Sequence, residues 1–193
     1  FAKRNIGEND NFICELIRND AINEFISYVT QTNCSLKSKI NPSSFESNLI
    51  LLKKDKDMFS IEKDQTTLIE YAAFFGSIQI FRYIYTITCQ MPSSVWIYSA
   101  HSNNLELIHF IEQINPNLVW YNLTKVFSKS IKCHHNDIAN YAFSKLKNKE
   151  KKSLNDEPIA FKYFNFLFIK NYMINKAKFY ELCKYDYYPF VEF

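Results

Sequence analysis

One pattern of apolar residues recurs along the sequence and constrains the fold more than any other feature. Within the pattern, apolar side chains lie three and four residues apart on either side of one interrupting position, as expected of two short amphipathic helices joined by a tight turn. The pattern returns 27 residues later and again after 31 more, with fainter copies near both ends of the chain. Its clearest copy consists of Ile69, Ala72, Ala73, Gly76, Ile80, Phe81 and Ile84.

The interrupting position predicts a turn in every copy. The residue there is Asp20, Gly76, Asn103, His134 or Asp186. These are the residue types that best accept the left-handed backbone conformation that ends a helix. One helical hairpin cannot bury both of its faces alone, so successive hairpins are expected to stack and to form a shared core. The sequence therefore predicts an all-α array of about five to six hairpins.

Two helix starts carry the capping-box pattern, in which side chains satisfy free amides at a helix N-terminus. One runs from Thr67 to Glu70, and the other, from Ser43 to Glu46, predicts a helix over residues 42–52. Loops are expected at 53–63 and 145–152. The chain has only 2 Gly and 5 Pro, which disfavours a β-sandwich or barrel because such folds need many tight turns.

Residues 64–81 resemble an ankyrin repeat, with Thr67, an aliphatic residue, Ala72 and Ala73, Gly76 and then an aliphatic pair. More narrowly, residues 69–76 and 131–139 are similar to degenerate ankyrin-type proteins abundant in parasitic protists, a family without assigned activity. The resemblance implies an ankyrin-like solenoid. Because the spacing of 27 to 31 residues is shorter than the usual ~33, the β-turn fingers between repeats are expected to be reduced or missing.

The resemblance covers nearly the whole chain, so residues 1–193 are expected to form a single array. Its clearest repeats span 63–144, and diverged repeats are expected in 1–62 and 145–193. The last copy stops at Val191, where a second helix should begin. We therefore expect the natural protein to continue with further repeats, and the present chain to be a fragment.

Catalysis, metal binding and cofactor binding find little support in the sequence. Cys133, His134 and His135 are adjacent, and adjacent helical residues point in different directions, so they cannot converge on one ion. With two glycines the chain has no phosphate-binding loop. The five cysteines include no Cys-x-x-Cys pair, which predicts a reducing compartment, the cytoplasm or the nucleus. No apolar stretch approaches the ~18 residues of a membrane span.

Three functions stay open. A protein-binding scaffold for an unidentified partner protein, without enzymatic activity or small-molecule substrate, is favoured because the array offers an extended surface without a chemical site. The alternative is binding of nucleic acid or another anionic surface through residues 145–193, which hold ten Lys and six acids. The basic run Lys145 to Lys152 contains no Arg, which favours a solvated loop. An enzyme module would need residues outside the chain.

The binding surface is expected at the two positions before each turn residue, which should face outward on the concave side of the array. These side chains vary from copy to copy, unlike the core positions. For the two phenylalanines a core position that fixes the turn is an equal alternative. The predicted surface consists of Phe74, Phe75, His101, Ser102, Lys132, Cys133, Lys184 and Tyr185.

Overall fold

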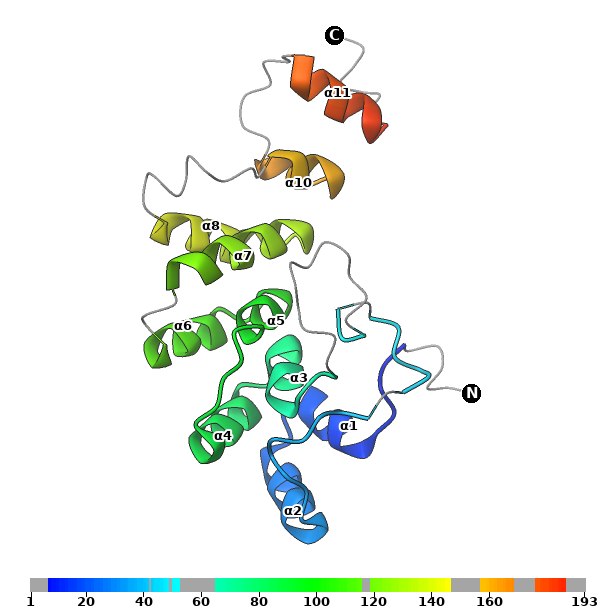
Figure 1. Ribbon diagram of the computed structural model, residues 1–193, viewed down its shortest axis with the longest axis vertical. Helices are drawn as coiled ribbons and strands as arrows, with labels where there is room; N and C mark the ends of the chain where they lie inside the picture. Colours follow the sequence, from blue (N-terminus) through cyan, green and yellow to red (C-terminus); the bar gives the residue numbers. More distant parts are fainter. Residues whose placement is uncertain are drawn as a thin grey trace. The chain divides into compact units, whose positions relative to one another are not determined.

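The computed structural model describes residues 7–41, 43–48, 50–52, 65–115, 119–146, 157–168 and 176–186, and divides the chain into two compact units (Figure 1). Unit 1, Phe1–Ile114, contains α1 (Phe12–Arg18), α2 (Ile22–Thr32), α3 (Leu68–Phe75), α4 (Ile78–Thr88), α5 (Val95–His101) and α6 (Leu105–Ile114). Unit 2, Asn115–Phe193, contains α7 (Val119–Lys132), α8 (Asn136–Lys145), α10 (Glu157–Lys162), the 3₁₀ helix η3 (Phe166–Phe168) and α11 (Lys176–Lys184).

The all-α prediction is confirmed for the described part of the chain. There the only β-pairing is an isolated bridge between Lys39 and Thr67. The prediction of a single array over 1–193 stays a prediction. The expected loops lie outside the described residues, apart from Lys145, which ends α8, and Leu146.

All five predicted turn residues adopt the left-handed conformation. Their φ angles are 47° at Asp20, 73° at Gly76, 55° at Asn103, 59° at His134 and 55° at Asp186. Gly76 follows the last residue of α3 directly. Each of the other four lies two residues after the last residue of a first helix or of α11. The prediction made from residue type at this position is therefore confirmed.

The turns are closed by a recurrent pair of backbone hydrogen bonds. The amide of Asp20 donates to the carbonyl of Ile17 (3.0 Å), and the next amide, of Ala21, donates to Leu16 (3.0 Å). The turns at Gly76 and His134 repeat both bonds. This arrangement, the Schellman motif, satisfies carbonyls that the end of a helix would otherwise leave without partners.

A sixth turn of the same kind lies at Phe164, where the sequence analysis predicts no turn. Its φ is 57°, and the amides of Phe164 and Asn165 donate to Phe161 (3.2 Å) and Ala160 (2.9 Å). This turn joins α10 to η3. It escaped prediction because a bulky aromatic residue rarely adopts a positive φ. The sequence signal that could have revealed this turn is the small residue Ala160, four positions before Phe164. Ala72 and Ser130 lie at the same distance before Gly76 and His134.

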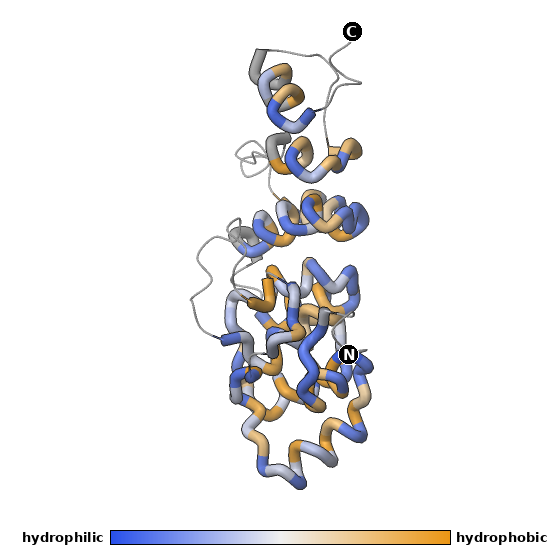
Figure 2. Tube along the Cα trace, turned by 90° about the vertical axis from the view of Figure 1, so that its right-hand side faces the viewer, coloured by the Kyte–Doolittle hydropathy of each residue, from blue (hydrophilic) through white to orange (hydrophobic). Residues whose placement is uncertain are grey.

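In unit 1 the first helices of the three hairpins stack on one another, α1 on α3 and α3 on α5, while α2 contacts α4 (Figure 1). Figure 2 shows orange and blue alternating along the helices, as expected of amphipathic segments. Helices α3 and α5 are exceptions, since every residue from Leu68 to Phe74 and from Val95 to Ala100 is buried. A helix that is buried on every side lies inside a core, and α3 lies between α1 and α5.

The predicted helix over residues 42–52 is wrong, because the described residues there form turns and extended chain. Local side-chain bonds compete with the helix. Ser43 Oγ accepts from the amide of Phe45, Glu46 Oε1 from Asn48, and Asn48 Oδ1 from Ile50. Bonds to the amide two residues ahead hold the backbone in turns and take the donors that a helix would use. The second capping box therefore does not form.

This segment instead packs against the start of the chain and the entry to α3. The amide of Ile40 donates to Thr66 (2.7 Å), Asn9 Nδ2 donates to Asn41 (3.0 Å), and the amide of Ser47 donates to Gly7 (2.9 Å). Its apolar residues Ile40, Ile50 and Leu51 are buried. The described residues of the connection between the first two hairpins therefore contribute to the core of unit 1.

The capping box at the start of α3 is confirmed. Thr67 Oγ1 accepts from the amide of Glu70, and Glu70 Oε2 accepts from the amide of Thr67 (2.7 Å). The other carboxylate oxygen, Oε1, accepts from Ser94 Oγ, directly before α5. One buried carboxylate thus fixes the starts of two stacked helices.

Gly76→Ala should lower the free energy of unfolding by about 1–3 kcal/mol, measured by urea denaturation. The methyl group makes φ = 73° unfavourable, and a Cβ there would lie 3.1 Å from Ser102 Cβ. Asn103→Gly is the matched control, because glycine accepts φ = 55° without strain, and a change within about 0.5 kcal/mol is expected. Equal effects of the two variants would contradict the role assigned to the turn.

Glu46→Gln should stabilise unit 1 more at pH 7 than at pH 4. Burial raises the pKa of the Glu46 carboxyl, and its Oε2 is buried without a hydrogen-bond partner. Because the pKa is higher in the folded than in the unfolded state, proton binding by Glu46 favours folding. This contribution is fully present below the unfolded-state pKa and is lost as pH rises through the folded-state pKa. Glutamine cannot ionise and avoids that loss. Urea denaturation at both pH values tests this, with the exposed Glu24→Gln as control, and a pH-independent effect of Glu46→Gln would refute it.

Candidate protein-binding surface

In unit 1 the predicted surface residues lie at the ends of α3 and α5, and one of them is not exposed. The side chain of Phe74 is only 4% exposed, so the expectation that it faces outward is wrong, and the alternative of a core residue is confirmed. The ring of His101 stacks on it, with 3.9 Å between centroids and 18° between planes. Phe75 and His101 are half-buried, so each leaves part of its ring at the surface.

Ser102 is half-buried and serves the turn. Its Oγ donates to the carbonyl of Ser99 (2.8 Å) and accepts from the amide of Asn104 (3.2 Å). Asn104 Nδ2 donates to the carbonyl of Gly76 (3.0 Å) and so links the turn after α5 to the turn after α3. The surface that unit 1 offers at this edge is therefore made by Phe75 and His101.

Similar links between consecutive turns recur. The residue after the turn residue donates its side chain to a carbonyl of the preceding turn, as Ser77 Oγ does to Ile17. In unit 2, Asn165 Nδ2 donates to Ile131 (3.0 Å). Ile17 and Ile131 occupy the same position, three residues before their turn residues. These bonds fix the spacing of neighbouring turns, and with it the spacing of the side chains just before them.

In unit 2 the predicted residues form part of a regular series. Lys132 and Cys133 are half-buried, Lys184 is exposed, and Tyr185 is half-buried. The turn at Phe164 adds the exposed Lys162, at the position equivalent to Lys132 and Lys184. We call Lys132, Lys162 and Lys184 the lysine series. Sequence reasoning missed its middle member because the turn at Phe164 was not recognised.

Each lysine of the series lies close to a tyrosine ring. The Nζ atoms of Lys132 and Lys162 lie 4.9 and 5.3 Å from the ring centroid of Tyr163. Lys184 Nζ lies 5.0 Å from the centroid of Tyr185. At these distances the cation is attracted to the negative face of the ring. The tyrosines therefore hold the ammonium groups near the turn edge.

Exposed apolar side chains follow the middle lysine of the series. Phe164 is 53% exposed, Phe166 44% and Leu167 76%. Single exposed apolar residues are ordinary, but three within four positions of one turn form a patch of the kind that marks interaction sites. Unit 2 thus presents cations and apolar groups together.

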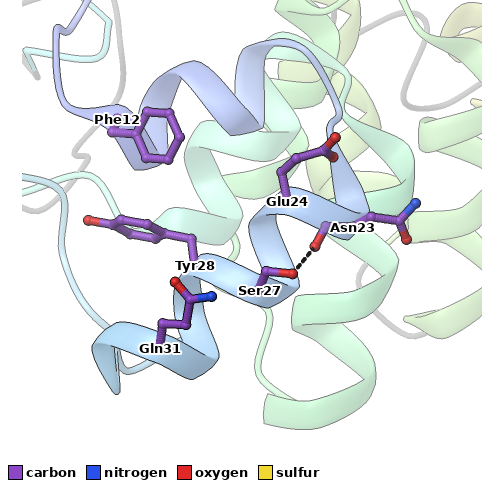
Figure 3. Close-up of a pocket in the computed structure, with 6 residues that line it drawn as sticks. All are labelled: Phe12, Asn23, Glu24, Ser27, Tyr28 and Gln31. Atoms are coloured by element: carbon purple, nitrogen blue, oxygen red, sulfur yellow. Dashed lines mark hydrogen bonds between the residues drawn. The ribbon is translucent and has the colours of Figure 1, made fainter.

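A shallow hollow lies on the first hairpin, between α1 and α2 (Figure 3). In Figure 3 the rings of Phe12 and Tyr28 lie next to each other, in edge contact with 5.3 Å between centroids and 67° between planes. The polar lining contains one carboxylate, from Glu24. The hydroxyl of Ser27 donates to the backbone carbonyl of Asn23 (2.9 Å).

The described residues contain no group of three or more His, Cys, Asp and Glu side chains that could hold a metal ion. A ring nitrogen of His134, Nε2, lies 2.7 Å from the carbonyl oxygen of Tyr163, so this histidine joins two turns. The five cysteines are free thiols, and burial raises the pKa of Cys14 to about 12, which makes it a poor nucleophile at neutral pH. None of the described helices is long and apolar enough to cross a membrane.

Comparison with known proteins adds no relative. No protein-family model, no curated protein and no solved structure matches this chain.

Proposed function

We propose that this chain is a non-catalytic protein-binding scaffold, an ankyrin-like solenoid whose hairpins stack in one array. The observation that carries the proposal is a left-handed residue at six equivalent positions, five of which follow from the sequence pattern, and four of these turns share the same pair of backbone hydrogen bonds. Such turns place side chains that differ from hairpin to hairpin at equivalent points of a regular framework. Variation on a regular framework is typical of repeat proteins that recognise other proteins.

The dimensions of the hairpins support the ankyrin-like interpretation. In unit 1 the first helices have 7, 8 and 7 residues, and the second helices have 11, 11 and 10. The connection from α4 to α5, residues 89–94, is described throughout and contains no strand, as expected of reduced fingers. We expect the scaffold to act in the cytoplasm or the nucleus.

Binding of nucleic acid or another anionic surface is the second candidate, because the lysine series adds three regularly placed cations to a basic C-terminal quarter. The run Lys147 to Lys152 lies outside the described residues. A nucleic-acid binder should lose affinity steeply as salt is raised.

The triple variant His101→Ala, Lys132→Ala, Lys184→Ala tests the proposed surface. Because Lys132 and Lys184 are not buried, their substitution should cost within about 0.5 kcal/mol each, whereas His101→Ala also uncovers the ring of Phe74 and should account for most of a moderate fall in the thermal midpoint. The variant should nevertheless retain much less of a partner that the parent captures from cell extract.

The control is a triple alanine variant at Thr30, Thr86 and Asn140, which are exposed on second helices. It should retain the partner as the parent does. Equal retention by both triple variants, or a collapse of stability in the first, would show that the turn edge is not the binding surface. Thermal denaturation and quantitative pull-down give the two readouts.

A further inference from the structure

We infer that the lysine series and the apolar residues beside it bind an extended, acidic segment of a partner protein that also carries apolar side chains. This inference rests on the proposed scaffold function and assigns a chemical class to the partner. The surface consists of Lys132, Lys162, Lys184, Phe164, Phe166 and Leu167.

The charge of the surface favours an acidic partner. The described residues of unit 2 contain eight Lys and four Asp or Glu. Three of those lysines stand at one position of three successive turns, two residues before His134, Phe164 and Asp186. Complementary charge steers association and fixes the register in which two chains meet. A partner with carboxylates at a regular interval matches this series.

The spacing of the lysines favours an extended segment. Because Lys132 Nζ and Lys162 Nζ each lie about 5 Å from the Tyr163 centroid, they are at most about 10 Å apart. Helix α10 packs on α7 and also on α11, and packed helices are typically ~8–10 Å apart, so successive turns repeat at a similar interval. A chain in the polyproline II conformation rises ~3.1 Å per residue and places every third side chain at ~9 Å. Carboxylates three residues apart would therefore meet successive lysines.

The apolar residues distinguish a polypeptide from a nucleic acid. A nucleic-acid base could stack on Phe164 or Phe166, but Leu167, the most exposed of the three at 76%, is aliphatic and offers no face for stacking. The cations of this surface are all lysines, whereas Arg is the residue whose planar guanidinium best fits phosphate. A peptide with acidic and apolar side chains can pair with the lysines and cover Phe164 and Leu167 at once. Removal of apolar surface from water contributes roughly 25 cal/mol per Å².

The binding experiment titrates the chain of residues 1–193 into each of three fluorescently labelled probes. The first is the peptide (Glu-Pro-Leu)₅, which favours an extended conformation with an acid at every third position. The second, (Gln-Pro-Leu)₅, has no charge on its side chains, and the third is a single-stranded deoxythymidine 15-mer. Fluorescence anisotropy titrations at low and physiological salt give the dissociation constants. We expect the parent chain to bind the acidic peptide most tightly.

Two triple variants with the same change in charge provide the matched comparison. Lys132→Gln, Lys162→Gln, Lys184→Gln should weaken binding of the acidic peptide at least tenfold. The control changes three other exposed lysines, Lys37, Lys39 and Lys145, to Gln, and affinity should stay within about twofold of the parent. Leu167→Ser should weaken binding about fivefold without a change in charge. Circular dichroism verifies that each variant keeps its helices.

Several results would overturn the inference. They are equal loss of affinity in both triple variants, no effect of Leu167→Ser, or no binding of the acidic peptide by the parent. Tighter binding of the deoxythymidine probe, lost in the first triple variant, would assign the surface to nucleic acid instead. The capture experiment with the native partner tests the scaffold function separately. If the alanine triple variant loses the native partner in the capture experiment but the parent chain does not bind the acidic peptide, the scaffold proposal stands. Only the assignment of an acidic partner segment is then refuted.

Discussion

The closure of each first helix by a left-handed residue is the constraint on which the rest of the structure depends. At Asp20 and His134 the same two amide-to-carbonyl bonds reverse the chain, so the second helix returns against the first. The residue that follows can then reach the preceding turn, as Ser77 and Asn165 do. Asp20 also accepts from the amides of Gln79 and Ile80 and so caps α4 from the neighbouring hairpin. Hydrogen bonds at the turns and apolar burial therefore both hold neighbouring hairpins together.

Unit 1 combines this repeated geometry with an irregular element. Residues 34–41, 43–48 and 50–52 pack near the entry to α3 and contribute Ile40, Ile50 and Leu51 to the core of unit 1. Around them, Arg18 contacts Glu8 at 2.8 Å and donates to Asn9 and Tyr71. Burial of an ionisable group requires such partners. Burial raises the pKa of the Glu46 carboxyl, whose Oε2 has no hydrogen-bond partner.

The two units offer different chemistry at equivalent positions. In unit 1 the rings of Phe74 and His101 stack, so the positions before the turns contribute to packing between hairpins. In unit 2 the same positions hold Lys132 and Lys162 close to the ring of Tyr163, where their charge stays near the surface. A common backbone frame thus serves a structural role in one unit and is proposed to serve recognition in the other. Side-chain type at these positions decides which role applies.

The all-α class, the capping box of α3, and five of the six left-handed residues that follow α1, α3, α5, α7, α10 and α11 can be derived from the sequence alone. These features depend on local chemistry: backbone preferences of Gly, Asn, Asp and His, and bonds between residues close in sequence. The tertiary structure is responsible for the turn at Phe164, the burial of Phe74 and the absence of a helix at 43–48. Asn165, next to Phe164, donates to the carbonyl of Ile131, and Phe74 is covered by a residue 27 positions away. At 43–48 the local side-chain bonds act together with bonds from Ser43 and Ser47 to the start of the chain. Contacts between distant residues thus add to local preference or outweigh it at these positions, and a local pattern does not contain them.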